Sequence, residues 1–353
     1  MNIGFIVPNI NNTGGTERAT INTCKALKKY TSYVPFIISV YGNNKIESIE
    51  DIEIYNLNLN NGSFLYKLLS YILFPLRLNK IVKLNQIKTI VGTTHVFNCL
   101  MYFSTKCKKI AWEHTIYEAC PNYSNIIRSV IYPKLDSLIL LSEKERIKYN
   151  YVPLTKRVSI PNISSFKCEK KALLKSKIII AVGRLCWVKG YDRLLDIAAV
   201  LKERIPDWTI YIYGDGELKE QIVDNIHKNK LEEYVILKGK TNNIKEAIFS
   251  SSIMVMTSYY EGLPMALIEA QTCGVPIVSY DCPEGPATIV TDGVDGYLIN
   301  DGNLNDFVDK VESLAINYEK RVEFGTNAFS SAQKYYDSSV CKKWKDLLDK
   351  ICS

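Results

Sequence analysis

The sequence predicts an α/β protein built from two Rossmann-like, doubly wound domains that face a cleft. Short apolar runs, each the length of one buried strand, alternate with helical patterns along the chain. A polar, lysine-rich segment interrupts this alternation near residue 165. With 353 residues, of which 47% are hydrophobic, the chain is long enough for two ordinary domains with full cores.

Three segments follow from this pattern. We expect a first domain over residues 1–165 and a second domain over residues 166–335. An Asp-Ser-Ser capping signal predicts a C-terminal helix within residues 336–353. We expect this helix to return to the first domain.

The strands of the two halves are expected at eleven apolar runs. The first half contains five of them, over residues 2–8, 33–41, 87–93, 108–114 and 137–142. The second half contains six, over residues 177–184, 208–214, 234–239, 253–258, 276–280 and 296–299. Each set has the size of one open parallel sheet, so strand carboxyl ends of both domains are expected at the cleft.

Several classes of protein are not favoured by the composition. The start has no basic region before its short apolar run, and the chain has no apolar span of 20 residues, so we expect neither a signal peptide nor a membrane-crossing helix. The ten cysteines form no C-x-x-C pair, which favours a reducing compartment. We therefore expect a cytoplasmic protein.

The net charge of +7 is concentrated in the first half. Residues 1–166 have a formal charge of +10 and the remainder −3. A basic half suits an anionic membrane surface, nucleic acid, or a solvated face without any partner. The sequence has no recognised nucleic-acid-binding motif, so we predict no nucleic-acid partner.

Residues 64–88 interleave large apolar side chains with basic ones. This pattern suits a membrane interface, and an equally good interpretation is a domain helix with a lysine-rich outer face. Pro75 is expected to divide the stretch into two short helices. The basic residues are Lys67, Arg77, Lys80, Lys83 and Lys88.

Two strand-to-helix turns carry residues suited to an anion. Gly14 and Gly15 follow the first strand and open a helix, so backbone amides and the helix N-terminus face the same point. In the second half, Gly183 ends a strand, and the loop that follows it contains Arg184 and Lys189. The planar Arg184 guanidinium and the Lys189 ammonium can both bind a diphosphate. Gly214 and Gly216 form a tight turn after the next strand.

The stretch around Glu261 and Glu269 predicts a phosphate-binding helix with a carboxylate at each end. Gly262 frees the backbone, Pro264 fits a first helical turn, and a glycine ends the helix. Glu269 is about 7–8 Å further along the helix axis than Pro264. Carboxylates in these places suit hydroxyl-rich groups on both sides of a diphosphate. No D-x-D motif occurs, so we expect no metal and no other cofactor.

Five features of the sequence together resemble glycosyltransferase family 4. They are the spacing from Glu261 to Glu269, the Gly-Arg-Leu and Lys-Gly loop, the Gly-Asp-Gly turn, the Ile-Pro-Asn after the first domain and the N-terminal Gly-Gly. This resemblance covers residues 3 to about 300. It implies a retaining GT-B enzyme, similar to hexosyltransferases that act in surface-polysaccharide assembly, including lipopolysaccharide O-antigen and capsule. It also implies that residues 1–165 form an N-terminal acceptor-binding domain and residues 166–335 a nucleotide-sugar-binding domain, with the nucleotide sugar as a substrate.

The resemblance also implies roles for individual residues of the second half. Arg184 and Lys189 would neutralise the donor diphosphate, and Glu269 would bind the ribose hydroxyls. Glu261 would bind the sugar together with the backbone amides of Gly262 and Leu263. The donor-binding set therefore also includes Gly183 and Gly214.

In the first half, the resemblance implies that Gly14 and Gly15 reach the phosphate and that His114 lies near the transferred sugar. The alternative for His114 is a structural histidine, and His95 is the substitute for it. Asn162 is expected beside the cleft, with a structural role as the alternative. One departure from the family pattern is Thr288, where a glutamate is common; Glu284 precedes it.

The function predicted is transfer of a hexose or N-acetylhexosamine from a nucleotide-diphosphate sugar, UDP above all, to a saccharide acceptor. The acceptor is expected to be lipid-linked, which places the protein at the inner face of the cell membrane in contact with anionic lipid. Two alternatives stay open: a GT-B nucleotide-sugar epimerase, and a sugar-nucleotide-binding protein without catalytic activity.

Overall fold

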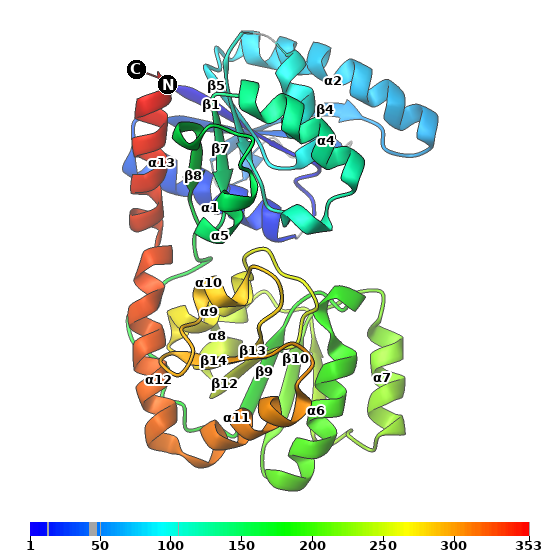
Figure 1. Cartoon of the computed structure of the whole chain (residues 1–353), viewed down its shortest axis with the longest axis vertical. Coiled ribbons are helices and arrows are strands. Elements are labelled where there is room, and N and C mark those ends of the chain that lie inside the picture. Colours follow the sequence, from blue (N-terminus) through cyan, green and yellow to red (C-terminus); the bar gives the residue numbers. More distant parts are fainter. Residues whose placement is uncertain (13, 42–47, 50, 105, 353) are drawn as a thin grey trace. The chain divides into compact units, whose positions relative to one another are not determined.

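The computed structural model describes residues 1–12, 14–41, 48–49, 51–104 and 106–352. The chain divides into two compact units. Unit 1 comprises Met1–Ser165 with Asp337–Ser353, and unit 2 comprises Phe166–Tyr336. Figure 1 shows each unit as a sheet with helices packed against it.

Unit 1 is built around a mostly parallel sheet with the order β3-β4-β2-β1-β5-β6-β7-β8, in which only the β3–β4 pair is antiparallel. Its strands are β1 (Asn2–Val7), β2 (Val34–Tyr41), β3 (Ser48–Ile49), β4 (Ile52–Leu59), β5 (Thr89–Gly92), β6 (Lys108–Trp112), β7 (Ser137–Leu140) and β8 (Arg157–Ser159). Its α-helices are α1 (Gly15–Tyr30), α2 (Phe64–Leu84), α3 (His95–Leu100), α4 (Asn122–Ile131), α5 (Glu143–Lys148) and α13 (Asp337–Cys352). Strands β3, β4 and β8 were not among the expected runs.

The C-terminal helix α13 packs on the core of unit 1. Trp344 is fully buried and its ring lies edge-on to Phe5 of β1 and Trp112 of β6, at centroid distances of 5.6 and 5.0 Å. The Cys341 thiol donates to the carbonyl of Ala26 in α1. Burial of so large an aromatic surface attaches the end of the chain to the first sheet.

Helix α2 corrects one expectation, because it is continuous from Phe64 to Leu84 with Pro75 inside it. Its buried side chains lie on both sides of the proline, at Ser70, Phe74, Leu78 and Val82, and Phe74 stacks on Phe97 of α3 at 5.2 Å. A proline removes one backbone hydrogen bond from a helix interior. Here the single packed stripe, spaced at four-residue intervals, holds both halves of the helix in line. No helix of the described residues combines the length and apolarity needed to cross a membrane.

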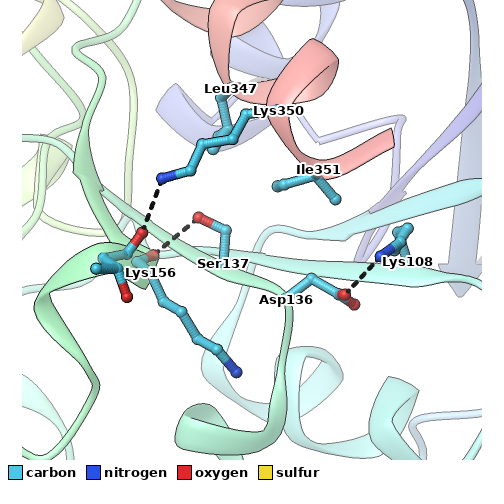
Figure 2. Close-up of a pocket in the computed structure, with 8 residues that line it drawn as sticks. Lys108, Asp136, Ser137, Lys156, Leu347, Lys350 and Ile351 are labelled. Atoms are coloured by element: carbon cyan, nitrogen blue, oxygen red, sulfur yellow. Dashed lines mark hydrogen bonds and ion pairs between the residues drawn. The ribbon is translucent and has the colours of Figure 1, made fainter. Parts of the chain in front are cut away.

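Unit 1 has a small pocket at the amino ends of its strands. Figure 2 shows Lys108 at the start of β6, Ser137 at the start of β7, Lys156 before β8, and Leu347 and Lys350 of α13 around it. The charged groups there are already paired: Lys108 with Asp136 at 3.4 Å, and Lys350 with the Thr155 carbonyl. Ligands of open α/β sheets bind at the opposite, carboxyl ends of the strands, so this pocket is not the candidate site.

Unit 2 contains a fully parallel six-stranded sheet with the order β11-β10-β9-β12-β13-β14. Its strands are β9 (Ile178–Val182), β10 (Thr209–Tyr213), β11 (Val235–Gly239), β12 (Ile253–Met256), β13 (Ile277–Tyr280) and β14 (Gly296–Ile299). Its α-helices are α6 (Tyr191–Arg204), α7 (Lys219–Lys228), α8 (Ile244–Phe249), α9 (Met265–Cys273), α10 (Pro286–Ile289), α11 (Leu304–Ile316) and α12 (Tyr318–Ser331). All six strands coincide with expected runs.

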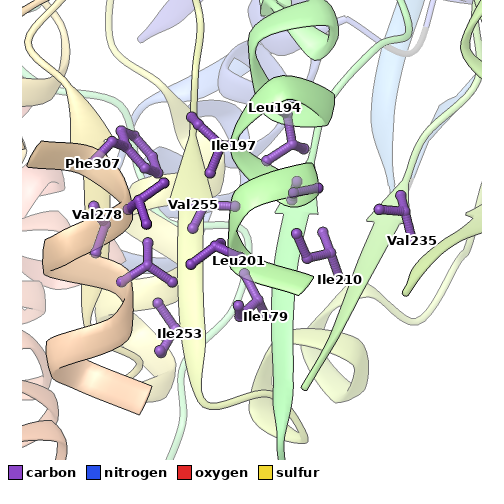
Figure 3. Close-up of a cluster of buried hydrophobic side chains, with 14 of the residues drawn as sticks. Ile179, Leu194, Ile197, Leu201, Ile210, Val235, Ile253, Val255, Val278 and Phe307 are labelled. Atoms are coloured by element: carbon purple, nitrogen blue, oxygen red, sulfur yellow. The ribbon is translucent and has the colours of Figure 1, made fainter. Parts of the chain in front are cut away.

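The core of unit 2 explains why its strands read as nearly continuous apolar runs. Figure 3 shows Leu194, Ile197 and Leu201 of α6 and Phe307 of α11 over one face of the sheet, against Ile179 and Val255. Successive side chains of a strand point to opposite faces, so the alternate residues Ile180 and Met254, also buried, pack on the other face. A parallel sheet covered on both faces needs apolar side chains at almost every position.

Candidate functional site

The strand order of unit 2 reverses direction between β9 and β12. From β9 the chain proceeds outward through β10 and β11, then returns to β12 and proceeds the other way through β13 and β14. In open α/β sheets, ligands bind outside the carboxyl ends of the two strands at such a switch point. The segments that follow these strands, residues 183–190 and 257–264, are therefore where a site is expected.

The first segment is held by the turn that follows β10. The backbone N–H of Gly183 donates to Tyr213 and that of Leu185 donates to Asp215, both at 3.0 Å. A Cβ added at Gly214 would collide with the Gly183 carbonyl oxygen, and one added at Gly216 would collide with that of Leu185. These glycines are needed because two loops lie in backbone contact there.

The second half of that segment forms a 3₁₀ turn, Trp187–Lys189, which ends at Gly190. Gly190 has φ 61° and ψ 40°, the left-handed conformation that a side chain disfavours, and an added Cβ would collide with the Thr257 carbonyl oxygen. The Thr257 hydroxyl donates to the Gly190 carbonyl at 2.8 Å. The loop after β9 is thereby fixed against the segment after β12.

Lys189 and Glu261 meet where these two segments touch. The Lys189 ammonium donates to Glu261 Oε1 at 2.6 Å, and the side chains are only 25% and 10% exposed. The Ser258 hydroxyl donates to the same carboxylate oxygen at 2.8 Å. Two hydrogen bonds from different segments therefore hold the Glu261 carboxylate in place.

Helix α9 begins directly after this carboxylate, with Pro264 as its N-cap residue. Its first-turn N–H groups lack intrahelical acceptors and carry the partial positive charge of the helix. Gly262 and Leu263 form the connection from Glu261 to that helix. Gly285 packs against it, since a Cβ there would lie 2.6 Å from Pro264 Cδ and 2.8 Å from Glu261 Cβ.

The other two charged residues predicted in unit 2 have different surroundings. Arg184 is exposed on the loop after β9. Glu269 is 1% exposed within α9. Burial raises the pKa of the nearby Cys273 thiol, Cys168 raises it further, and the charge of Glu269 makes a smaller contribution. The structure thus brings Lys189 and Glu261 together, and it places Glu269 more than one helical turn beyond the start of α9.

The residues predicted in unit 1 lie at the carboxyl ends of its strands. Gly14 is the N-cap residue of α1 and Gly15 its first residue, after β1. A Cβ at Gly15 would meet nothing within 4 Å, whereas one at Gly14 would lie 2.6 Å from Glu17 Oε2. Thr13, in the same turn, is outside the described residues. Asn162 is 3% exposed and follows β8 of unit 1.

His114 follows β6 and its ring lies 4.3 Å from that of Trp112. Burial lowers the pKa of its imidazole to about 3, so the ring is neutral near pH 7. Within the described part of the chain, no hydrogen-bond partner reaches its buried Nε2. His95, at the start of α3, also has a pKa lowered by burial, and its Nδ1 lies 3.8 Å from the Cys120 thiol.

The residue before His114 belongs to a buried ionic group. The Glu113 carboxylate is 3.8 Å from the Arg128 guanidinium, with side-chain exposures of 1% and 0%. It also accepts hydrogen bonds from Asn98 and Tyr132, and Arg128 donates to Tyr149 at 2.7 Å. Such a group fixes the end of β6, and with it the backbone that positions His114.

Sequence reasoning did not single out Ser258, Gly285 and Tyr191 as contacts of the site. The Tyr191 hydroxyl donates to the Gly183 carbonyl at 3.0 Å, and burial, with a contribution from Glu261, raises the pKa of this phenol. The only available signal was proximity along the chain: Ser258 lies three residues before Glu261, and Tyr191 begins the helix after Lys189.

The arrangement in unit 2 combines a cation, a fixed carboxylate and a helix N-terminus at one switch point. A cation and a helix N-terminus stabilise phosphate oxygens. A carboxylate that already accepts two hydrogen bonds retains lone pairs for hydroxyl groups. These are the groups needed to bind a molecule that has both phosphates and hydroxyls.

The chain is similar to known proteins over almost its whole length. Residues 165–331 match the family of glycosyl transferases group 1. An uncharacterized glycosyltransferase of Haemophilus influenzae is 30% identical over 357 residues, which cover 98% of this chain and 99% of the relative. The amylovoran biosynthesis glycosyltransferase AmsD of Erwinia amylovora is 27% identical with the same coverage.

Among solved structures, TarM of S. aureus, solved with fondaparinux, α-GlcNAc-glycerol and UDP, superposes with a TM-score of 0.82 at 19% identity, covering 98% of this chain and 99% of TarM. The predicted fold class, two Rossmann-like α/β domains of the GT-B type with a C-terminal helix, is confirmed. With a relative of 30% identity aligned from end to end, the chain belongs to the glycosyl transferases group 1 family, as the sequence resemblance implied.

Proposed function

We propose that this protein transfers a hexose or N-acetylhexosamine from a UDP-sugar to a saccharide acceptor, with retention of configuration and without a metal ion, in the synthesis of a surface polysaccharide. The observation that carries the proposal is the hydrogen-bonded Lys189–Glu261 pair beside the N-terminus of α9. The names of the relatives support a polysaccharide product, since AmsD is named for amylovoran biosynthesis. The UDP in the TarM structure supports the nucleotide.

In the proposed reaction, Lys189 and Arg184 face the donor diphosphate together with the first amides of α9. Negative charge grows on the diphosphate as the bond to the sugar breaks, so fixed cations and helix amides stabilise the transition state more than the ground state. The acceptor hydroxyl attacks the anomeric carbon on the face from which the diphosphate leaves. Its proton passes to a diphosphate oxygen, and the sugar keeps its configuration.

Glu261 and Glu269 are assigned to hydroxyls on the two sides of the diphosphate. Glu261, held by Lys189 and Ser258, accepts from the transferred sugar, and Gly262 and Leu263 contribute backbone amides. Glu269 accepts hydrogen bonds from the ribose hydroxyls. Because its side chain is only 1% exposed, the groups that surround α9 lie between it and solvent, and the donor must pass them to reach it. Neutral His114 is assigned to a sugar hydroxyl through the imidazole nitrogen Nε2.

A lipid-linked acceptor is proposed because unit 1 has two exposed apolar surfaces. The α2 outer face consists of Leu65, Leu69, Ile72 and Leu76, which are 50–74% exposed, and continues on the same side of the helix with Lys80 and Lys83. The α4 stripe consists of Tyr123, Ile126, Ile127 and Val130, which are 48–70% exposed. Both helices contact α3, and Figure 1 shows α2 and α4 within the same unit.

The proposed occupant of these surfaces is an anionic membrane. Residues 61–88 include five basic side chains and no acidic one, which suits acidic lipid headgroups rather than a basic protein partner. Apolar side chains of this size enter the boundary between headgroups and acyl chains. The proposed location is the cytoplasmic face of the cell membrane, where the protein would meet both the nucleotide sugar and a lipid-linked saccharide.

A thermal-shift panel of nucleotide sugars, followed by a product assay, tests the proposal. A donor that raises the melting temperature further as its concentration increases binds the folded state. That donor is then incubated with methyl glycosides and with a short-chain lipid diphosphate N-acetylglucosamine as acceptor probes, and NMR of the product reports the anomeric configuration. Isomerised donor without acceptor would show an epimerase instead. Stabilisation without any product would show a binding protein.

A further inference from the structure

One exposed aromatic residue next to the Lys189–Glu261 pair has no role in the function proposed so far. Trp187 is 57% exposed, whereas Trp112, Trp208 and Trp344 are between 0% and 6% exposed. It begins the 3₁₀ turn that contains Lys189. Large aromatic surfaces are the main carriers of contact energy at binding sites, and most of this one remains open to solvent.

One face of the Trp187 ring is packed against another aromatic side chain. It stacks on Tyr259 with a centroid distance of 4.7 Å and an interplanar angle of 7°. The Arg193 guanidinium lies 3.7 Å from the centroid of the same Tyr259 ring. A stacked ring and a guanidinium at these distances occupy opposite faces of Tyr259, because neither leaves room for the other.

Polar contacts hold this stack as well. The Tyr259 hydroxyl donates to Asp192 at 2.7 Å, and Arg193 donates to Asp301 at 2.6 Å. The backbone N–H of Tyr259 donates to the Val188 carbonyl at 2.8 Å, which joins the two segments beside the stack. One face of Trp187 is therefore packed and immobilised, and the opposite face is available.

The surroundings of the open face suit a sugar ring. Tyr260, 45% exposed, lies 6.2 Å from Trp187 at an angle of 45° and precedes Glu261. A pyranose has an apolar face of C–H groups and a rim of hydroxyls. The negative face of an indole attracts those C–H groups, and the charged pair offers an acceptor and a donor to the rim.

We propose that Trp187, supported by Tyr259 and bordered by Tyr260, is a binding platform for a pyranose ring. The position of the ring relative to the diphosphate rests on the proposed function, in which Glu261 lies at the sugar side. Two sources of this ring have the same chemistry, the transferred sugar of the donor and the acceptor saccharide. A nucleobase also stacks on indole, but the proposed function puts the nucleoside on the Glu269 side of α9.

The test uses the fluorescence of Trp187 in the full chain and needs no turnover. Because the other three tryptophans are buried, iodide quenching of tryptophan emission reports mainly on Trp187. The probes are methyl α-D-glucopyranoside, methyl α-D-galactopyranoside, methyl N-acetyl-α-D-glucosaminide, UDP and the corresponding UDP-sugars. We expect protection of Trp187 from iodide by at least one of the methyl glycosides, or by a UDP-sugar under conditions in which UDP gives no protection. Protection by a glycoside assigns the platform to the acceptor, and protection by a UDP-sugar alone assigns it to the donor.

Substitutions test whether Trp187 contributes to the affinity for the saccharide. Trp187→Ala should weaken binding of the protecting saccharide about tenfold, measured by thermal shift, while leaving the UDP-induced shift unchanged. Trp187→Phe should retain most of the affinity because it keeps an aromatic face. Tyr318→Ala, which removes a 41% exposed aromatic of α12, is the control and should change neither shift.

Protection by UDP alone, or by none of the probes, would overturn the proposal, as would a Trp187→Ala variant that binds the protecting saccharide as tightly as the natural protein. The proposed function is tested separately. If a glycoside protects Trp187 from iodide but no donor yields a product, the platform is supported and the enzymatic assignment is wrong.

Discussion

The ammonium of Lys189 lies 2.6 Å from a carboxylate oxygen of Glu261, and this contact joins two segments that are 72 residues apart in the chain. Each segment follows one of the two strands at which the sheet order of unit 2 reverses. Without a ligand, each group neutralises the charge of the other, and the charge-assisted hydrogen bond keeps both side chains ordered. Donor phosphates would provide a second partner for the cation.

Removing that cation should reduce turnover without unfolding the protein. Lys189→Ala is expected to lower kcat by about 10²–10³, the usual loss when one donor to a developing anion is removed. Lys177→Ala is the control, because Lys177 pairs with Asp207 at an exposed position before β9. Product formation at saturating donor measures the effect, and an unchanged kcat in Lys189→Ala would disprove the role of the lysine.

Breaking the buried ion pair of unit 1 should lower stability strongly. Arg128→Met leaves the Glu113 carboxylate without its cation in the interior, at an expected cost of about 3–5 kcal/mol in the free energy of unfolding. Adding Glu113→Gln should recover part of that loss, because the uncompensated charge disappears. Guanidinium unfolding followed by circular dichroism measures both. A cost of less than about 1 kcal/mol for Arg128→Met would show that the pair is not needed.

His114 should make the folded state sensitive to acid. Its pKa is about 3 in the folded protein and about 6.5 in an unfolded chain, so between these values the unfolded state binds a proton that the folded state does not. The stability linked to this histidine is present above pH 6.5 and is lost as the pH falls toward 3. The natural protein should therefore lose more stability than His114→Gln on acidification, measured by urea unfolding from pH 7 to pH 4. Parallel curves for the two proteins would contradict the lowered pKa.

Reversing the charges of α2 should weaken binding to anionic lipid. A lysine near a membrane surface contributes about 1 kcal/mol, so Lys80→Glu with Lys83→Glu should weaken binding by at least about 30-fold. Sedimentation with phosphatidylglycerol vesicles measures it. Lys342→Glu with Lys343→Glu, two exposed lysines of α13 in the same unit, is the matched control and should bind normally. If both double variants lose vesicle binding equally, the attraction is non-specific. The apolar contribution is tested separately, because Leu69→Ser with Ile72→Ser should weaken insertion into the same vesicles.

Strand periodicity was sufficient to find the sheets, because parallel strands buried on both faces leave a compact apolar signature. The expected runs did not include β3, β4 or β8. Strands β3 and β8 have only two and three residues, and the alternating sequence of β4 from Ile52 to Leu59 contains two asparagines. The sequence-based expectation also failed at α2, where the local effect of Pro75 suggested a break. Packing of Phe74 and Leu78 decided the continuous helix, and such packing cannot be seen in a local window of sequence.

The sequence predicted a helix next to Pro264, a loop with Arg184 and Lys189, and the family itself, because each is encoded by residues close together in the chain. The helix begins one residue later than predicted, at Met265, with Pro264 as its N-cap residue. Tertiary structure alone decided that Lys189 bonds to Glu261, that Glu269 is buried, and that Trp187 stacks on Tyr259 with one face open. These relationships depend on which strands become neighbours in the sheet. Strand order is set by the packing energy of the whole unit, and no short stretch of residues contains it.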